Sequence, residues 1–334
     1  MDVVKWIEAQ LKPDACTSDR FIYDDMDSQS GCSLPIIYQP FDGSKKSHWR
    51  DRGSRFDFLC ATRGEGKRLL DFGPGDGWPS LIVAPDAAEV VGVDGSRRRV
   101  EVCTKNAARL GQANAHFQYV APGSALPFAD NSFDGVMAAS SIEQSPDPRR
   151  TLVELHRVLK PGGRLRMCYE SFSRDRGGRA RECVTWPIDA QRCRLILFDR
   201  DFANERAVQY GITYALSEAD LTSAFVNHSG HIVFDDISVP ILEKIRPAVI
   251  DARICTTIHA SGRTLAAWLG EIGFREVLPS HAGSDFAGSL FDAYPENERP
   301  RELIDIDALL RPAVKVVVEM PAPLVIDPPI TAVK

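Results

Sequence analysis

The feature that most constrains the fold is a regular alternation of strand-like and helix-like segments that begins at Arg68. Apolar runs typical of buried strands occur at residues 68–72, 89–94, 115–120, 132–140 and 164–171. Amphipathic helical segments lie between them, at residues 78–87, 96–111 and 147–163. Repeated β-α-β units with apolar strands form a parallel sheet covered by helices on both faces. We therefore expect an open, doubly wound α/β domain that binds ligands at the carboxyl ends of its strands.

The alternation breaks after residue 173 and returns only near the end of the chain. Residues 174–258 contain hairpin-like strands and a helix, and this mixed composition indicates an α+β insertion. A helix and a strand follow at 261–280, and the run AVKVVVEM at 313–320 is predicted to be a last strand. The Pro-rich tail after it is expected to be extended on the surface or loose. The predicted parts are an N-terminal cap (1–66), a core (67–173), the insertion (174–258) and the rest of the core with the tail (259–334).

The loop GPGDG follows the first predicted strand and carries Gly73, Gly75 and Gly77. Glycines at such a place let a ligand approach the main chain and tolerate positive φ. The dinucleotide fingerprint G-x-G-x-x-G would need its third glycine at position 78, where this chain has Trp78, so dinucleotide binding is disfavoured. Asp94 ends the second predicted strand, a position from which a carboxylate can accept both hydroxyls of a ribose.

These motifs resemble those of the class I S-adenosylmethionine-dependent methyltransferases. The run LLDFGPGDG looks like the first motif of that family, and VVGVDGS looks like its acidic end of the second strand. The segment 125–165 is similar to the small-molecule branch that includes ubiquinone/menaquinone-type C-methyltransferases. The resemblance implies a Rossmann-like class I fold with an open, mostly parallel sheet of seven strands and S-adenosylmethionine as the cofactor.

The resemblance also assigns cofactor contacts to individual residues. It places Asp71 near the amino group of the ligand, Gly73, Gly75 and Gly77 along its methionine part, and Asp94 with Gly95 at the ribose. Relatives usually offer an acidic residue to the adenine amine after the third strand. This chain has APGSALPF there, so Ser124 and the Ala125 backbone are expected to substitute. Ser140 is the remaining cofactor contact, in the loop that follows the fourth strand.

Two further side chains are candidates with an equally simple structural alternative. Glu143 stands in the loop where the acceptor is expected, and it is either a catalytic base or a solvated loop residue. Tyr23 is either an aromatic lid over the sulfonium, because cation–π contact suits a sulfur cation, or a core residue.

Composition excludes several partner classes. The formal net charge of −6 argues against a surface that follows nucleic-acid phosphates. The eight cysteines form no C-x-x-C pair and no Cys/His group at zinc spacing, so no metal site is predicted and the thiols are expected to be reduced. The N-terminal residues lack the layout of a secretory signal, and the apolar runs are far shorter than the roughly 20 residues that span a bilayer. We expect a cytoplasmic protein with no membrane partner.

The predicted reaction is methyl transfer to a small-molecule acceptor by in-line displacement, which mainly requires alignment of acceptor, methyl group and sulfur. Alternatives are a same-fold enzyme with other chemistry (aminopropyl transfer, decarboxylation or hydroxylation) and a non-catalytic cofactor-binding partner subunit. The insertion is expected either to complete the acceptor pocket or to form a homodimer interface. Its apolar candidates for either role are Trp186, Ile196, Phe198, Phe202, Tyr210 and Tyr214.

Overall fold

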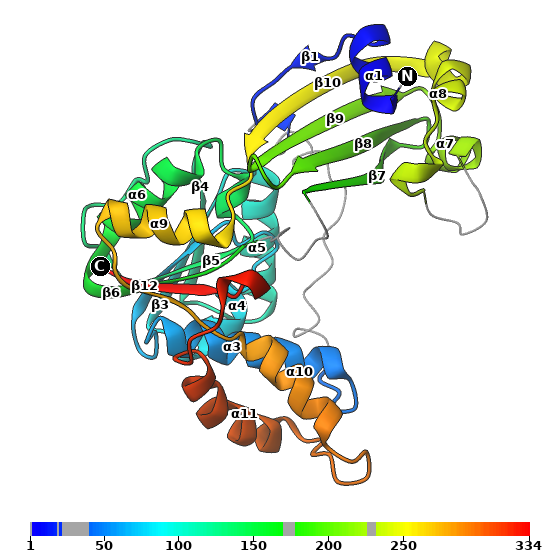
Figure 1. Cartoon of the computed structure of the whole chain (residues 1–334). Coiled ribbons are helices and arrows are strands. Elements are labelled where there is room, and N and C mark those ends of the chain that lie inside the picture. The colour runs from blue at the N-terminus through cyan, green and yellow to red at the C-terminus, as the bar shows by residue number, and fades with distance from the viewer. Residues whose placement is uncertain (1, 19, 22–39, 170–177, 226–231) are drawn as a thin grey trace. The chain divides into compact units, whose positions relative to one another are not determined.

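The computed structural model describes residues 2–18, 20–21, 40–169, 178–225 and 232–334, and its chain forms two compact units (Figure 1). The core unit comprises Ser30–Arg174 and Ser261–Lys334. The insertion unit comprises Met1–Gln29 and Asp175–Ala260. The predicted N-terminal cap is therefore divided, because its first part groups with the insertion and its second part with the core.

The core unit contains a seven-stranded sheet in the order β11-β12-β6-β5-β2-β3-β4. The strands are β2 (Arg68–Phe72), β3 (Glu89–Asp94), β4 (Ala115–Tyr119), β5 (Phe133–Ala139), β6 (Leu159–Cys168), β11 (Arg275–Pro279) and β12 (Ile330–Val333). Strands β2 to β6 are parallel, whereas β12 is antiparallel to both of its neighbours. This arrangement confirms the predicted fold class. The strand order reverses between β5 and β2, so their carboxyl ends flank the crevice in which such sheets bind ligands.

Helices cover both faces of this sheet, as apolar strands require. The helices α6 and α9 lie on one face and α3 and α4 on the other (Figure 1). Their bounds, with the other helices next to the central strands, are α3 (Lys46–Ala61), α4 (Ser80–Val83), η3 (Ala84–Asp86), α5 (Arg97–Arg109), η4 (Ile142–Gln144), α6 (Pro148–Val158) and α9 (Gly262–Ile272). Three of them begin at a side chain that accepts a backbone N–H of the first turn: Ser96, Asp147 and Ser261. The predicted helices of this region are confirmed, except that the one predicted to reach residue 163 ends at Val158, where β6 takes over.

The C-terminal part of the core differs from the prediction. Most of the segment 313–320 belongs to a helix, α11 (Leu303–Val317), which follows α10 (Gly283–Ala293). The run of valines suggested a strand, but Ile306, Leu310, Val314 and Val317 recur at helical spacing and are all buried. The last strand of the sheet is instead β12, which lies within the tail after η7 (Leu324–Ile326). Its residues 330 and 332 have no exposed surface, so the prediction of a surface or loose tail is wrong for this end.

The insertion unit is α+β, as predicted. Its sheet has the order β1-β10-β9-β8-β7, and all pairs are antiparallel except β1 with β10. The elements are α1 (Val3–Gln10), β1 (Asp14–Ala15), β7 (Arg179–Asp189), β8 (Arg192–Asp201), β9 (Arg206–Tyr214), α7 (Glu218–Phe225), η5 (Phe234–Asp236), α8 (Val239–Ile245), η6 (Arg246–Ala248) and β10 (Val249–Ile258). Within the described ranges, the chain has no helix long and apolar enough to cross a membrane.

Two of the aromatic residues proposed for a pocket or dimer interface lie in the core of the insertion unit. Tyr210 and Tyr214 are 2% and 1% exposed and pack in one cluster with Trp6 and Ile7 of α1. Alternate residues of β9 face this cluster, because successive side chains of a strand point to opposite faces. The prediction that these tyrosines line a pocket or an interface is therefore wrong. Ile196 is buried as well, in a smaller cluster that also holds Trp186 and Phe198.

Candidate functional site

The glycine loop leaves the carboxyl end of β2 with three residues at positive φ: Gly73 (75°), Gly75 (60°) and Gly77 (115°). A Cβ on Gly73 would lie 2.4 Å from Ser141 Cβ, and a Cβ on Gly77 would lie 2.4 Å from Leu81 Cδ1. These two glycines are therefore required by contacts within the chain. Among the residues that the structure describes, none has a heavy atom within 4 Å of a Cβ built on Gly75, so these residues leave the backbone open at this position.

Two side chains of helix α5 form hydrogen bonds to the backbone of the glycine loop. The thiol of Cys103 donates to the carbonyl oxygen of Gly75 at 3.1 Å, and Asn106 Nδ2 donates to the carbonyl oxygen of Asp76 at 2.8 Å. Both side chains are buried and lie one helical turn apart. Sequence reasoning missed these two anchors; the signal for Asn106 was a polar residue on the apolar face of an otherwise amphipathic helix.

Asp94 ends β3 directly beside the loop. Its side chain is 6% exposed, and its two oxygens accept hydrogen bonds from Gly75 N at 3.2 Å and from Ser96 N at 2.8 Å. An ionised carboxylate is an acceptor that can take hydrogen bonds from several donors, which is the property needed to bind ligand hydroxyls. Gly95 follows in the turn and is half-buried. Asp94 thus bridges the open part of the glycine loop and the start of α5.

Asp71 lies beneath the loop and has no exposed surface. Its Oδ2 accepts from Ser80 N at 2.9 Å and from Ser80 Oγ at 2.6 Å, which ties β2 to the start of α4. Its Oδ1 is buried and has no hydrogen-bond partner among the residues that the structure describes. Burial raises the pKa of Asp71 to about 7, more than the two Ser80 bonds lower it. A cationic group next to Oδ1 would favour the ionised form of this carboxylate.

The end of β5 forms the second wall of the crevice. Ser140 is exposed and has a φ of 52°, a conformation that non-glycine residues rarely adopt. Its amide donates to the carbonyl oxygen of Cys168, and its own carbonyl accepts from Gln144 Nε2 at 2.8 Å. Glu143 is half-buried within η4, the single turn that follows. Backbone strain of this kind is frequent at functional sites, which makes the loop 140–144 a candidate wall for the acceptor.

The remaining predicted contacts lie after β4. Asp94 pairs with Tyr119, and Val120 N donates to the carbonyl oxygen of Asp94, so the chain leaves β4 next to the proposed ribose position. Ser124 and Ala125 are exposed in the turn that follows. Tyr23 lies outside the described residues. The structure therefore gathers Asp71, the glycine loop and Asp94 around the switch in strand order, with Ser140 and Glu143 after β5 and Ser124 and Ala125 after β4.

This donor set fits S-adenosylmethionine. Asp94 supplies a carboxylate for two vicinal hydroxyls, the backbone at Gly75 is open to a ligand, and the buried Asp71 Oδ1 is an orphaned acceptor for an ammonium group. The part of the chain that the structure describes has no group of three or more His, Cys, Asp or Glu side chains that could hold a metal ion. Fold and site together define a class I methyltransferase domain.

Comparisons with known proteins agree with this class. Residues 70–167 match the family model described as "Methyltransferase domain". A demethylmenaquinone methyltransferase from Clavibacter sepedonicus is 40% identical over 103 residues, which cover 31% of this chain and 41% of the relative. A ubiquinone/menaquinone biosynthesis C-methyltransferase from Geotalea uraniireducens is 40% identical over 125 residues, covering 35% and 49%. Residues 70–167 are therefore similar to methyltransferase domains, in agreement with the fold of the core unit.

Solved structures with similar segments include the YcgJ protein from Bacillus subtilis, at 32% identity and a TM-score of 0.32, covering 34% of this chain and 49% of that one. The [4+2]-cyclase SpnF is 32% identical with a TM-score of 0.38, covering 47% and 62%. The chain spans about half, or less, of the length of the curated relatives it matches.

Proposed function

We propose that the chain is an S-adenosylmethionine-dependent methyltransferase that acts on a small organic molecule. The observation that carries the proposal is the open backbone at Gly75 between two buried carboxylates, Asp71 and Asp94, at the switch in strand order. This is the place at which open α/β sheets bind their ligands. The names of the similar curated proteins, which are methyltransferases, support the same activity.

Each residue has a defined task toward the cofactor. Asp94 accepts the two ribose hydroxyls, and its bond to Gly75 N holds the loop in the shape that leaves room for the methionine part. Asp71 Oδ1 lies under the loop as the acceptor for the amino group. Ser124 and the backbone of Ala125, after the neighbouring strand, are the contacts proposed for the adenine.

The cofactor supplies an activated methyl group on a sulfonium, and the protein has to align the acceptor with it. The loop 140–144 borders this position, since it follows β5 on the other side of the strand-order switch. Glu143 is the proposed base, which removes a proton from the acceptor where the acceptor carries one. Ser140 positions the loop through its bonds to Cys168 and Gln144.

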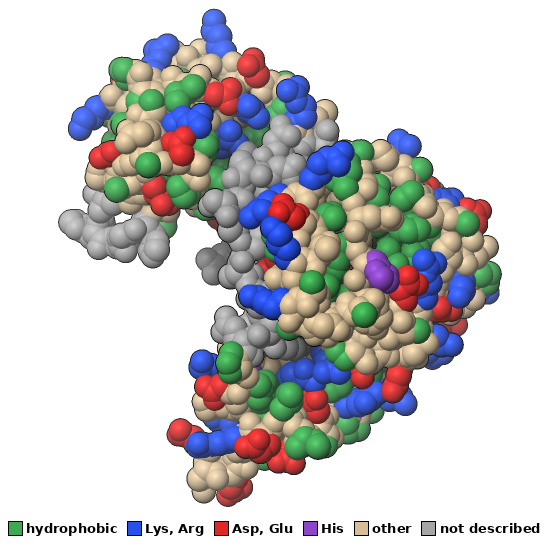
Figure 2. Space-filling model, turned by 180° about the vertical axis from the view of Figure 1, so that it is seen from behind, with side chains coloured by type: hydrophobic (Ala, Val, Ile, Leu, Met, Phe, Trp, Pro, Cys, Tyr) green, Lys and Arg blue, Asp and Glu red, His purple; other side chains and the backbone are tan. Residues whose placement is uncertain are grey.

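The surface supports a small acceptor. On the face that Figure 2 shows, Lys and Arg side chains are interspersed with Asp and Glu side chains and do not form one continuous basic field. A nucleic-acid substrate requires such a field along its phosphates. We therefore propose an organic small molecule, and no nucleic acid, as the methyl acceptor.

A label-transfer assay tests the proposal. The full chain is incubated with S-adenosylmethionine labelled in its methyl group and with phenols, catechols, amines and quinols as candidate acceptors. Label should move to at least one acceptor, and Asp94→Ala should abolish the transfer, while the control Asp292→Ala, an exposed residue of α10, should not. Cofactor binding without transfer to any acceptor would favour the partner-subunit alternative, and acceptor conversion without label would favour other chemistry on the same fold.

We infer that the insertion unit governs the choice of acceptor or assembly into a homodimer. One face of its sheet carries the half-buried side chains of Trp186 and Phe198. Tyr210 and Tyr214 of β9 instead pack inside the core of the insertion unit. Light scattering after size exclusion tests the dimer: a mass of one chain would contradict it.

The acceptor role is tested by joining residues 169 and 261 with a short Gly/Ser linker in a chain that also lacks residues 1–29. Cofactor affinity should be retained and transfer should be lost.

We also propose a cytoplasmic location. The seven cysteines that the structure describes form no disulfide with one another, which is usual for proteins of a reducing compartment. Fractionation of the source cells, followed by detection of the protein with an antibody, tests this location. Recovery in an extracellular or envelope fraction would contradict it.

A further inference from the structure

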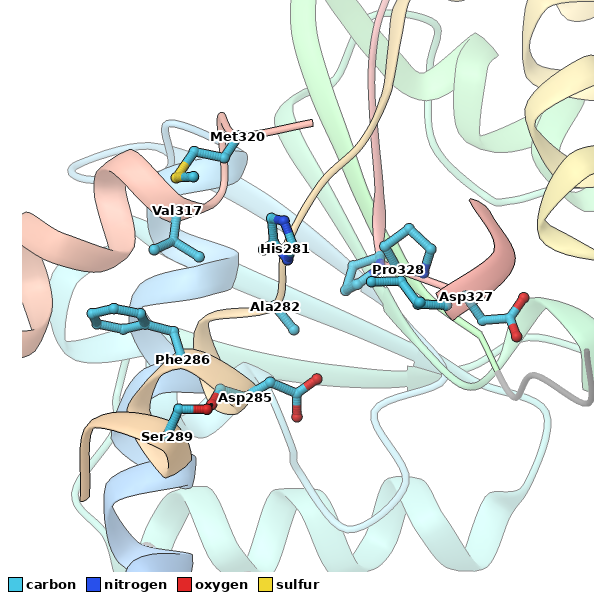
Figure 3. Close-up of a pocket in the computed structure, with 11 residues that line it drawn as sticks. His281, Ala282, Asp285, Phe286, Ser289, Val317, Met320, Asp327 and Pro328 are labelled. Carbon is cyan, nitrogen blue, oxygen red and sulfur yellow. The ribbon is translucent and has the colours of Figure 1, made fainter. Parts of the chain in front are cut away.

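The pocket of the core unit is mainly apolar. It has a volume of about 400 Å³, and Phe286 of α10 and Val317 of α11 are among its lining residues (Figure 3). Of its two carboxylates, that of Asp285 is exposed and pairs with Arg50 at 2.9 Å, and that of Asp327 points away from Phe286 and Val317. The described lining therefore does not select one chemical class of ligand. A more specific arrangement of reactive groups is found in the insertion unit.

Cys16 and Cys255 occupy neighbouring positions on two paired strands of the insertion unit. The strands β1 and β10 are parallel, and Ala15 lies opposite Ile254, so the next residue of each strand is a cysteine. The amide of Cys16 donates to the carbonyl oxygen of Ile254 at 2.9 Å, which extends the ladder by one residue. Figure 1 shows β1 beside β10. The two cysteines are therefore side by side, although they are far apart in the sequence.

The side chains of the two cysteines lie on the same face of the sheet. Both belong to the apolar cluster that also contains Phe21 and Ile196. The thiol of Cys16 donates to the carbonyl oxygen of Ile254, with its Sγ 3.6 Å from that oxygen, so it is directed toward β10. Ile254 is the residue that precedes Cys255, and the Cys16 thiol is thus close to the backbone that carries the second thiol.

The spacing of the two strands suits a disulfide bond. Neighbouring strands lie about 4.7–4.9 Å apart, and the Cα atoms of disulfide-bonded cysteines are usually about 4.4–6.8 Å apart. The Cβ atoms of such a bond approach to about 3.8 Å. Strand β1 has two residues and lies at the edge of its sheet, so it can supply the small shift that this approach requires.

The other two described cysteines of the insertion unit cannot form such a bond with each other. Cys183 and Cys193 belong to the cluster on the opposite face of the sheet. Cys183 pairs with Leu197, which is four residues beyond Cys193 on β8. Four residues of a strand span about 13 Å, whereas cysteines more than about 7 Å apart cannot be bridged without movement of the backbone. The geometry therefore distinguishes the pair Cys16 and Cys255.

We propose that Cys16 and Cys255 form a reversible disulfide when the chain meets a small disulfide oxidant such as glutathione disulfide. Cys16 is half-buried and Cys255 is 2% exposed, so Cys16 reacts first. Its thiolate attacks one sulfur of glutathione disulfide, whose S–S bond breaks and releases one glutathione thiolate. The thiol of Cys255 then loses its proton and attacks the sulfur of Cys16, which releases the second glutathione. Two protein thiols are oxidised, and one glutathione disulfide is reduced to two thiols.

The bond fastens the N-terminal segment to the insertion unit. Helix α1 packs on this unit through Trp6 and Ile7, and β1 pairs with β10, so the described contacts of this segment are noncovalent. A disulfide restricts the unfolded chain, and more strongly when the closed loop is long, as it is for residues 16–255. The oxidised chain should therefore unfold at a higher urea concentration than the reduced chain. This inference does not depend on methyl transfer, because no residue of the cofactor site takes part in it.

Peptide mapping identifies the bond directly. The folded full chain is equilibrated with glutathione disulfide and glutathione, alkylated, and digested with trypsin without reduction. Mass spectrometry should find the peptides 6–20 and 254–263, which carry Cys16 and Cys255, joined as the main cross-linked product. Reduction before alkylation should remove the product. Absence of this product at excess glutathione disulfide, or cross-links from Cys16 mainly to another cysteine, would overturn the proposal.

Variants relate the bond to stability. Oxidation should shift the urea midpoint upward in the wild-type chain and should leave it unchanged in Cys16→Ser. The matched control is Cys183→Ser, which replaces another half-buried cysteine of the same unit and should retain both the cross-link and the shift. An equal shift in wild type and Cys16→Ser would show that the stabilisation does not come from a bond between Cys16 and Cys255.

Discussion

Replacement of Gly75 by valine, compared with the same replacement at Gly111, separates an effect on ligand binding from the cost of backbone strain. Gly75 has a φ of 60° and Gly111, just after α5, has a φ of 68°; at both positions no described residue lies within 4 Å of an added Cβ. Valine at either position should cost a similar free energy of unfolding, about 1–2 kcal/mol for the left-handed conformation. Only at Gly75 does the new side chain enter the space assigned to the cofactor.

The expected effect on affinity follows from the space beside Gly75. The valine methyl groups would occupy the space in which the proposed ligand lies against the main chain. Affinity should therefore fall by at least about tenfold, which corresponds to about 1.4 kcal/mol. Urea unfolding measures the stability of both variants, and calorimetry with S-adenosylhomocysteine measures binding. Equal affinities of Gly75→Val and Gly111→Val would refute the placement of the ligand.

Three further predictions concern buried polar groups. Because the pKa of Asp71 is raised to about 7, the folded state binds one more proton than the unfolded state between about pH 4 and 7, and the free energy of unfolding should fall as the pH rises through this window. Urea unfolding at a series of pH values measures this slope, and Asp71→Asn should flatten it. An unchanged slope would contradict the raised pKa of Asp71. Arg166→Met leaves the buried carboxylate of Asp57 uncompensated and should cost about 3–5 kcal/mol of unfolding free energy, whereas Arg149→Met at an exposed ion pair should cost less than about 1 kcal/mol. Asn106→Ala removes the bond to the glycine loop and should cost about 1 kcal/mol and weaken cofactor binding; unchanged calorimetry and unfolding would show that this anchor has no effect.

The central part of the fold could be predicted from the sequence because each element carries its own local evidence. Apolar runs of strand length alternate with helices that begin at capping residues such as Ser96 and Asp147. The glycine loop and Asp94 occupy the ends of adjacent parallel strands, so their proximity follows from topology alone. The candidate cofactor residues could therefore be proposed without knowledge of tertiary contacts.

The parts that escaped prediction depend on contacts between distant segments. The valine-rich end of α11 has the β-branched composition of a strand, and the helix is favoured by its packing against Trp49, Phe56 and Ala61 of α3. Strand β12 is four residues long and follows several prolines, so its local pattern is weak until it pairs with β6. Trp6 belongs to the insertion unit through contacts with β8 and β9, which no local pattern of residues 1–10 reveals.

The most direct test of the account is a calorimetric titration of S-adenosylmethionine into the full chain and into Asp94→Ala. The account predicts a single saturable site in the wild-type chain. Loss of the carboxylate that accepts two hydroxyls should weaken binding by about 2–3 kcal/mol, roughly 30- to 150-fold. Absence of binding to the folded wild-type chain, or equal affinity in the folded Asp94→Ala variant, would contradict the assignment of this site.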